Sequence, residues 1–148
     1  MIQGHDSVVV RTTVRLLMPW IQIFALYVLF HGHGSPGGGF QGGVIMASSY
    51  VLLGLALGRQ ELDRLISEAG ILRWAAVGVL AYLVTGIAAL GGAGALLDYA
   101  ALPVPGLPAV RLRYLGMMAI EAGVFVAVAA ALVLIFLRLA RTGEGEEP

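Results

Sequence analysis

The stretch FHGHGSPGGGFQGGV, residues 30–44, joins two of the most apolar runs in the chain. It contains two histidines and no other ionisable group, and six of its last eleven residues are glycine. Such a stretch fits a metal site, a phosphate-binding loop, or a backbone turn at an unusual place in the fold. The composition and the flanking segments bear on all three explanations.

The composition places the chain in the integral membrane class. Hydrophobic residues make up 59% of the chain and charged residues 12%, and the mean hydropathy is +0.89. Soluble domains carry about 25% charged residues, so a water-soluble globule is not expected. The absence of cysteine excludes disulfides and thiolate metal centres. The formal net charge of zero gives no argument for nucleic acid as a partner.

Four stretches are long and apolar enough to cross a membrane. A span needs about 20 mainly apolar residues, because every backbone amide must find its hydrogen-bond partner inside the helix. The stretches cover residues 14–30, 40–57, 74–97 and 114–137. No small-residue cleavage pattern follows the first, so we expect a retained span. We predict an all-α integral membrane protein with four transmembrane helices and a single membrane domain, residues 1–148.

The arginines predict the orientation. With four spans, both termini and the connection between the second and third spans share one side of the membrane. That side has seven arginines: Arg11, Arg15, Arg59, Arg64, Arg73, Arg138 and Arg141. The other side has Arg111 and Arg113. We expect a multi-pass protein of the plasma membrane, and the positive-inside rule predicts that both termini lie in the cytoplasm and the glycine-rich loop outside.

The glycine-rich loop fits a conformational role best. It lacks the GK[ST] ending of a phosphate-binding loop. His31 and His33 would need further metal ligands from elsewhere, and none lies near in sequence, so we predict no metal. Glycine permits positive φ and close backbone approach, and Pro36 fixes one turn residue, so the loop can fold back at membrane depth. The residues assigned to this structural loop are His31, Ser35, Pro36, Gly37, Gly38, Gly39, Phe40, Gly42 and Gly43.

Glu121 is the sharpest candidate for a functional residue. It lies in the fourth span, seven residues after Tyr114, which is about 11 Å along a helix and inside the hydrocarbon zone. An ionisable residue at this depth is costly and by default marks an ion or proton path with a nearby partner. The alternative is a structural hydrogen bond from a protonated carboxylic acid to another helix.

Helical periodicity predicts where Glu121 points. A stripe of small residues, suited to close helix packing, comprises Gly116, Ala119, Gly123, Ala127 and Ala130. Glu121 projects about 140° away from this stripe, beside Met117, Val124 and Phe125. If the small stripe packs within the chain, we expect the Glu121 face to contact another subunit, since the acid cannot face lipid.

Three further polar residues are candidates for the same ion path: His33, Gln41 and Ser48. Serine, threonine and glutamine in membrane helices more often form interhelical hydrogen bonds, and that alternative stays open for them. No Ser-His-Asp arrangement, paired carboxylate set or dinucleotide motif appears. We therefore predict no catalytic chemistry by this chain alone.

Two long segments resemble a known family. They are TVRLLMPWIQIFALYVLFHGHGSPGGGFQGGVIMASSYVLLGLALG, residues 13–58, and YLGMMAIEAGVFVAVAAALVLI, residues 114–135. Both closely resemble the B subunit of the Mrp (Mnh) multisubunit cation/proton antiporters, a module that recurs in membrane-bound hydrogenase and respiratory complexes. The resemblance extends over about residues 12–137. The residues that match the family by position are His31, His33, Ser35, Pro36, Gly37, Gly38, Gly39, Phe40, Gln41, Gly42, Gly43 and Glu121.

The resemblance implies a four-span accessory subunit, without a cofactor, of an assembly that exchanges sodium for protons. Its partners would be the other membrane subunits and the lipid bilayer, with Na⁺ and H⁺ as the transported ions. Burial favours the neutral form of a carboxyl group unless a cation is near, so sodium and a proton would compete at Glu121. The alternative is a structural subunit of an antiporter-related hydrogenase or respiratory redox complex. An autonomous channel is disfavoured because Glu121 would be unsatisfied in a monomer.

Overall fold

The computed structural model describes residues 7–32, 36–91 and 95–144, with the backbone alone for residues 142–144. The long helices are α1 (Val8–His31), α2 (Gly39–Leu57), α4 (Glu68–Gly91) and α5 (Ala109–Glu144). Two short helices join them: α3 (Arg59–Leu65) and the 3₁₀ helix η2 (Tyr99–Ala101). The four long helices are long and apolar enough to cross a membrane. The prediction of an all-α protein with four transmembrane helices is confirmed.

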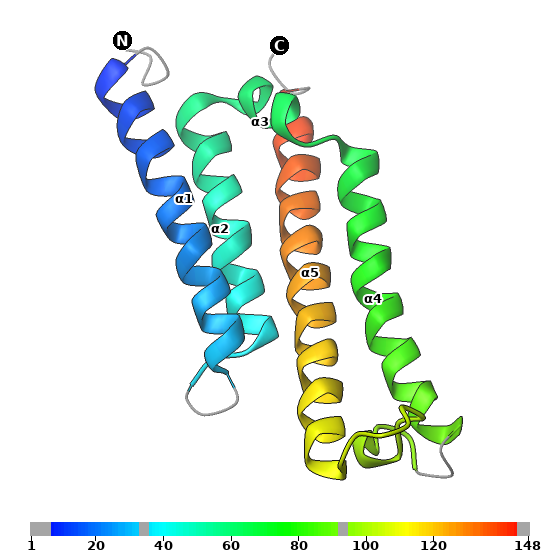
Figure 1. The fold of residues 1–148 in the computed structure, drawn as a ribbon. Coiled ribbons are helices and arrows are strands. Elements are labelled where there is room, and N and C mark those ends of the chain that lie inside the picture. The colour runs from blue at the N-terminus through cyan, green and yellow to red at the C-terminus, as the bar shows by residue number, and fades with distance from the viewer. Residues whose placement is uncertain (1–6, 33–35, 92–94, 145–148) are drawn as a thin grey trace.

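The last helix of the chain lies in the middle of the bundle. Helices α2 and α4 pack against different sides of α5, and α1 packs mainly against α2 (Figure 1). Glycines allow the close contact between α4 and α5. A Cβ added at Gly78 would lie 2.6 Å from the carbonyl oxygen of Gly123, so only glycine fits between the two backbones.

The bundle has two ends that differ in charge. One, here called the terminus end, contains the first turns of α1, helix α3 and the last turns of α5 (Figure 1). The other, here called the loop end, contains the α1–α2 connection and η2 (Figure 1). Arg111 and Arg113 lie at the loop end, and the other seven arginines lie at the terminus end or in the helical turns next to it.

Ion pairs link the helices at the terminus end. Glu61 of α3 lies 3.8 Å from Arg11 and 3.7 Å from Arg15, both of α1. Glu68, the first residue of α4, pairs with Arg138 and Arg141 of α5. These pairs join α1 to α3 and α4 to α5, although each contributes little on its own because water reaches it.

Helix α3 lies in a segment for which the sequence analysis expected only a charged connection. Gly58 ends α2 with a φ of 87°, a conformation that glycine adopts readily. The chain then turns for seven residues and buries Leu62 completely. Leu62 thus anchors the connection in the apolar core.

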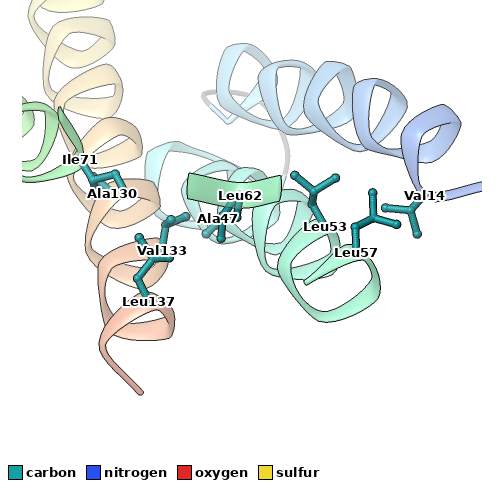
Figure 2. Packing of buried hydrophobic residues seen from close by; sticks show 9 residues of the cluster. All are labelled: Val14, Ala47, Leu53, Leu57, Leu62, Ile71, Ala130, Val133 and Leu137. Atoms are coloured by element: carbon teal, nitrogen blue, oxygen red, sulfur yellow. The ribbon is translucent and has the colours of Figure 1, made fainter. Parts of the chain in front are cut away.

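The main core lies in the half of the bundle next to the terminus end. Its nine buried residues are Val14, Ala47, Leu53, Leu57, Leu62, Ile71, Ala130, Val133 and Leu137. Figure 2 shows them as a row that runs from Val14 of α1 to Ile71 of α4. Every long helix therefore contributes to one apolar cluster.

Three helices begin five or six residues earlier than the sequence predicted: α1, which starts at Val8 rather than near residue 14, and also α4 and α5. The third span was expected over residues 74–97, whereas α4 runs from Glu68 to Gly91 because the hydroxyl of Ser67 caps it, accepting from the N–H of Gly70 at 3.1 Å. Leu97 lies in a turn with a φ of 66°. Helix α5 starts at Ala109 rather than near residue 114, immediately after the last proline of the connection, Pro108.

Candidate functional site

The described part of the glycine-rich loop folds back onto α1. The N–H of Gly38 donates to the carbonyl oxygen of Val28 in α1 at 3.2 Å. A Cβ on Gly32 would overlap the backbone of Gly38, so the two ends of the loop are in backbone contact. Gly38 has a φ of 115°, which side-chain-bearing residues rarely adopt. Glycine at these positions is thus a geometric requirement of the turn.

The first turns of α2 present a face of glycines to the neighbouring helices. A Cβ on Gly39 would overlap the backbone oxygen of Glu121. One on Gly42 would lie 2.9 Å from the carbonyl oxygen of Ala25 and 3.0 Å from the ring of Phe125. One on Gly43 would lie 2.8 Å from the carbonyl oxygen of Phe125. This face brings the start of α2 into backbone contact with α5.

The side chain of Glu121 meets the N-terminus of α2. Its Oε2 atom accepts a hydrogen bond from the backbone N–H of Gly39, the first residue of α2. The N-cap residue Gly38 has no side chain to cap the helix, so the carboxylate of α5 supplies the acceptor. A helix N-terminus carries a partial positive charge and favours an anion. The arrangement can therefore hold a charged carboxylate at membrane depth.

The predicted direction of Glu121 is wrong. We expected its face to contact another subunit, but Glu121 contacts Gly38 and Gly39 of its own chain, and Phe125 is buried at 7% exposure. The small stripe packs on α4, as the contact of Gly123 with Gly78 shows. The prediction failed because α5 has neighbours on two sides. Helical periodicity distinguishes the small-residue face of α5 from the face that contains Glu121. It does not show that other helices cover both faces.

Two of the other candidate ion-path residues, Gln41 and Ser48, do not join Glu121. Gln41 and Ser48 lie on the exposed side of α2, away from its glycine face. The hydroxyl of Ser48 donates to the carbonyl oxygen of Ile45 in its own helix at 2.7 Å. His33 and Ser35 lie outside the described residues.

The remaining loop residues have varied settings. Pro36 and Phe40 are exposed, and Gly37 is half-buried. His31 is exposed and stacks on Tyr27, with its Nδ1 atom 3.0 Å from the backbone oxygen of Tyr27. Within the described ranges, no group of three or more His, Cys, Asp or Glu side chains is arranged to hold a metal ion.

A polar contact joins α1 and α2 near the middle of both helices. The amide nitrogen of Gln22 donates to the hydroxyl of Ser49 at 3.3 Å, and Ser49 in turn donates to the carbonyl oxygen of Met46 at 2.7 Å. Ser49 is completely buried. This pair fits the interhelical role expected for polar residues in membrane helices.

Sequence reasoning missed Tyr99, which lies near Glu121 at the loop end. Its ring packs against α5 where Gly116 leaves space: a Cβ on Gly116 would lie 2.7 Å from Cγ of Tyr99. Burial raises the pKa of the Tyr99 phenol, and the nearby Tyr82 and Glu121 raise it further. The one available signal was Gly116, which the sequence analysis assigned to a helix contact.

Comparison with known proteins identifies the family. A family model described as a domain related to the MnhB subunit of Na⁺/H⁺ antiporter matches residues 9–134. Proteins of Staphylococcus aureus strains Newman and USA300, provisionally named antiporter subunit mnhB2, are 42% identical over 57 residues. The aligned segment covers 38% of this chain and 40% of each staphylococcal protein. Because the family model matches most of its length, the chain belongs to the family of domains related to the MnhB antiporter subunit.

Proposed function

We propose that this chain is an accessory membrane subunit of a multisubunit Na⁺/H⁺ antiporter and that Glu121 lies on the ion route. The observation that carries the proposal is the hydrogen bond from Gly39 to the carboxylate of Glu121. Glu121 lies about 18 Å along α5 from its first residue, within a helix long and apolar enough to span the membrane. Family membership supports the choice of antiport over other kinds of transport.

The energetics of the site favour exchange of one cation for another. An ionised acid near the centre of a membrane helix costs about 2.5–3.5 kcal/mol. The N-terminus of α2 offsets about 0.3–1 kcal/mol of this cost, or up to about 2 kcal/mol in a partly buried site. The remaining cost is reduced when either a proton or a sodium ion binds the carboxylate. The two ions then compete for one site, and competition of this kind can couple their flows.

The proposed partners are the other membrane subunits of the antiporter. Apolar side chains cover much of the outer surface of α1 and α4, including Trp20, Phe24, Leu80 and Val84. These faces require lipid or other membrane helices around them. With the arginine-rich terminus end in the cytoplasm, the site of Glu121 lies in the half of the membrane nearer the outside.

Sodium-dependent proton exchange in inverted vesicles that contain the whole assembly tests the proposal. Glu121→Gln removes the charge but keeps an amide oxygen that can accept from Gly39. We expect exchange to be lost while the assembly remains intact on a native gel. Glu61→Gln is the matched control, because it makes the same chemical change in an acid that pairs with arginines at the terminus end. If the Glu121→Gln assembly exchanges sodium for protons at the normal rate, Glu121 is not on the ion route and serves only in helix packing.

A further inference from the structure

An open cavity of about 410 Å³ lies at the loop end, between the connection that contains η2 and helix α5. Its lining residues are Leu97, Asp98, Tyr99, Arg113, Tyr114 and Met117. Most of its wall is apolar, although its lining residues include a carboxylate, two phenols and a guanidinium. We call it the loop-end cavity.

The loop-end cavity leads toward Glu121 along one stripe of α5. Tyr114, Met117 and Glu121 are three and four residues apart, so they lie on the same side of the helix. The first two line the cavity, and Glu121 lies about 6 Å further along the helix axis than Met117. Tyr99, held against α5 at Gly116, is close enough to Glu121 for the acid to influence its ionisation.

Two approaches to Glu121 are filled by residues of its own chain. On the α2 side, Gly38 and Gly39 lie in backbone contact with it. Toward the terminus end, the next turn of α5 contains the buried ring of Phe125, which packs with Ala25 and Leu29 of α1. On the side toward the loop end lies Met117, a half-buried and unbranched side chain that can change rotamer without moving the backbone.

We propose that the loop-end cavity is the water-filled entrance to Glu121 from the loop side of the membrane. Asp98, whose carboxylate accepts from the N–H of Ala100 at 3.2 Å, supplies a negative charge at the mouth, beside the positive charge of Arg113 in the same lining. Met117 covers Glu121 and moves aside when an ion passes. The ion-binding part of this inference rests on the proposed function, whereas the existence of a water-filled entrance does not.

Cysteine labelling tests the entrance directly, because the chain has no cysteine of its own. Met117→Cys and Asp98→Cys are introduced singly into the whole assembly and treated with a positively charged, membrane-impermeant methanethiosulfonate in vesicles of both orientations. Labelling is followed by the mass of this subunit. Ile87→Cys is the matched control: the antiparallel contacts of Gly78 with Ala127 and of Tyr82 with Gly123 place Ile87 at about the depth of Met117, and it is 58% exposed.

We expect Met117→Cys and Asp98→Cys to react in the same vesicle orientation. Because the thiolate forms in water and not in lipid, Met117→Cys should react at least about tenfold faster than Ile87→Cys. Sodium should slow the labelling of Met117→Cys, and Glu121→Gln should abolish this protection. If Met117→Cys reacts no faster than Ile87→Cys while Asp98→Cys reacts, the entrance does not exist.

The remaining outcomes separate the two proposals. Fast labelling of Met117→Cys together with normal exchange by Glu121→Gln would keep the entrance and reject the ion route through Glu121. Fast labelling that sodium does not slow would reject the sodium site. If Met117→Cys fails to assemble, Tyr114→Cys replaces it, since it lines the same cavity one turn nearer the loop end.

Discussion

The carboxylate of Glu121 accepts a hydrogen bond from the backbone N–H of Gly39, 82 residues earlier in the chain. The bond joins the beginning of the second transmembrane helix to the body of the fourth. It satisfies a backbone donor that α2 cannot satisfy itself, and it places the carboxyl group of Glu121 at the positive end of a helix. The same contact therefore affects both packing and charge, and substitutions can separate the two effects.

Glu121→Leu should prevent assembly, whereas Glu121→Gln should not. Leucine leaves the N–H of Gly39 without its acceptor, which costs about 1–3 kcal/mol for a buried donor. The abundance of the assembled complex on a native gel measures the difference. Equal abundance of the two variants would show that the hydrogen bond contributes nothing to packing.

Gly39→Ala should separate α2 from α5. The added methyl group would overlap the backbone oxygen of Glu121, and overpacking of this kind costs about 1–3 kcal/mol or more. Gly91→Ala is the control, because no atom of the described residues lies within 4 Å of the Cβ that it adds. Resistance of the complex to detergent should fall for the first variant and stay unchanged for the second. Branched residues at Gly38 or Gly39 should likewise damage assembly before they change ion selectivity.

Ser49→Ala should destabilise the bundle more than Ser48→Ala. The buried hydroxyl of Ser49 accepts from Gln22 across the α1–α2 contact, whereas Ser48 bonds only within its own helix among the hydrogen bonds described. Interhelical hydrogen bonds in membranes average about 0.6 kcal/mol, with a maximum near 1.7 kcal/mol. Unfolding in mixed micelles, combined with Gln22→Leu in a double-mutant cycle, measures the coupling. A coupling energy of zero would contradict the interhelical bond.

Glu68→Gln should weaken the complex slightly, and only at low salt. It removes the partner of Arg138 and Arg141, which are exposed to solvent. Exposed pairs contribute about 0.2–1 kcal/mol and are screened as ionic strength rises. The variant should be less thermally stable than the wild type at low salt, and the two should be equally stable at high salt. An effect that persists at high salt would indicate a buried role for Glu68.

The sequence predicted the elements of this fold better than their arrangement. Hydropathy located all four transmembrane helices, because the membrane requires a minimum apolar length. It placed the start of α4 too late, since the decisive signal was the cap at Ser67 and not an apolar residue. Helix α3 was missed because its sequence is charged and a single buried residue, Leu62, holds it in place.

The candidate site was predictable in its residue but not in its partner. An acid in an apolar span signals function on its own, which identified Glu121. Its partner is a backbone N–H. Every residue except proline has such a group, so the residue types do not identify which one binds Glu121. Side-chain periodicity could therefore not reveal that Glu121 faces Gly39, nor that α5 is enclosed by α2 and α4.

The central position of α5 has a consequence for biosynthesis. Helices α1, α2 and α4 precede α5 in the chain, so they enter the membrane before the helix against which α2 and α4 pack has been inserted. Until α5 is inserted, the first N–H of α2 lacks the carboxylate that accepts its hydrogen bond. A chain that stops before Ala109 would leave a helical hairpin and a separate helix with exposed glycine faces. Membrane quality control could thus recognise an unfinished subunit by the same surfaces that hold the finished one together.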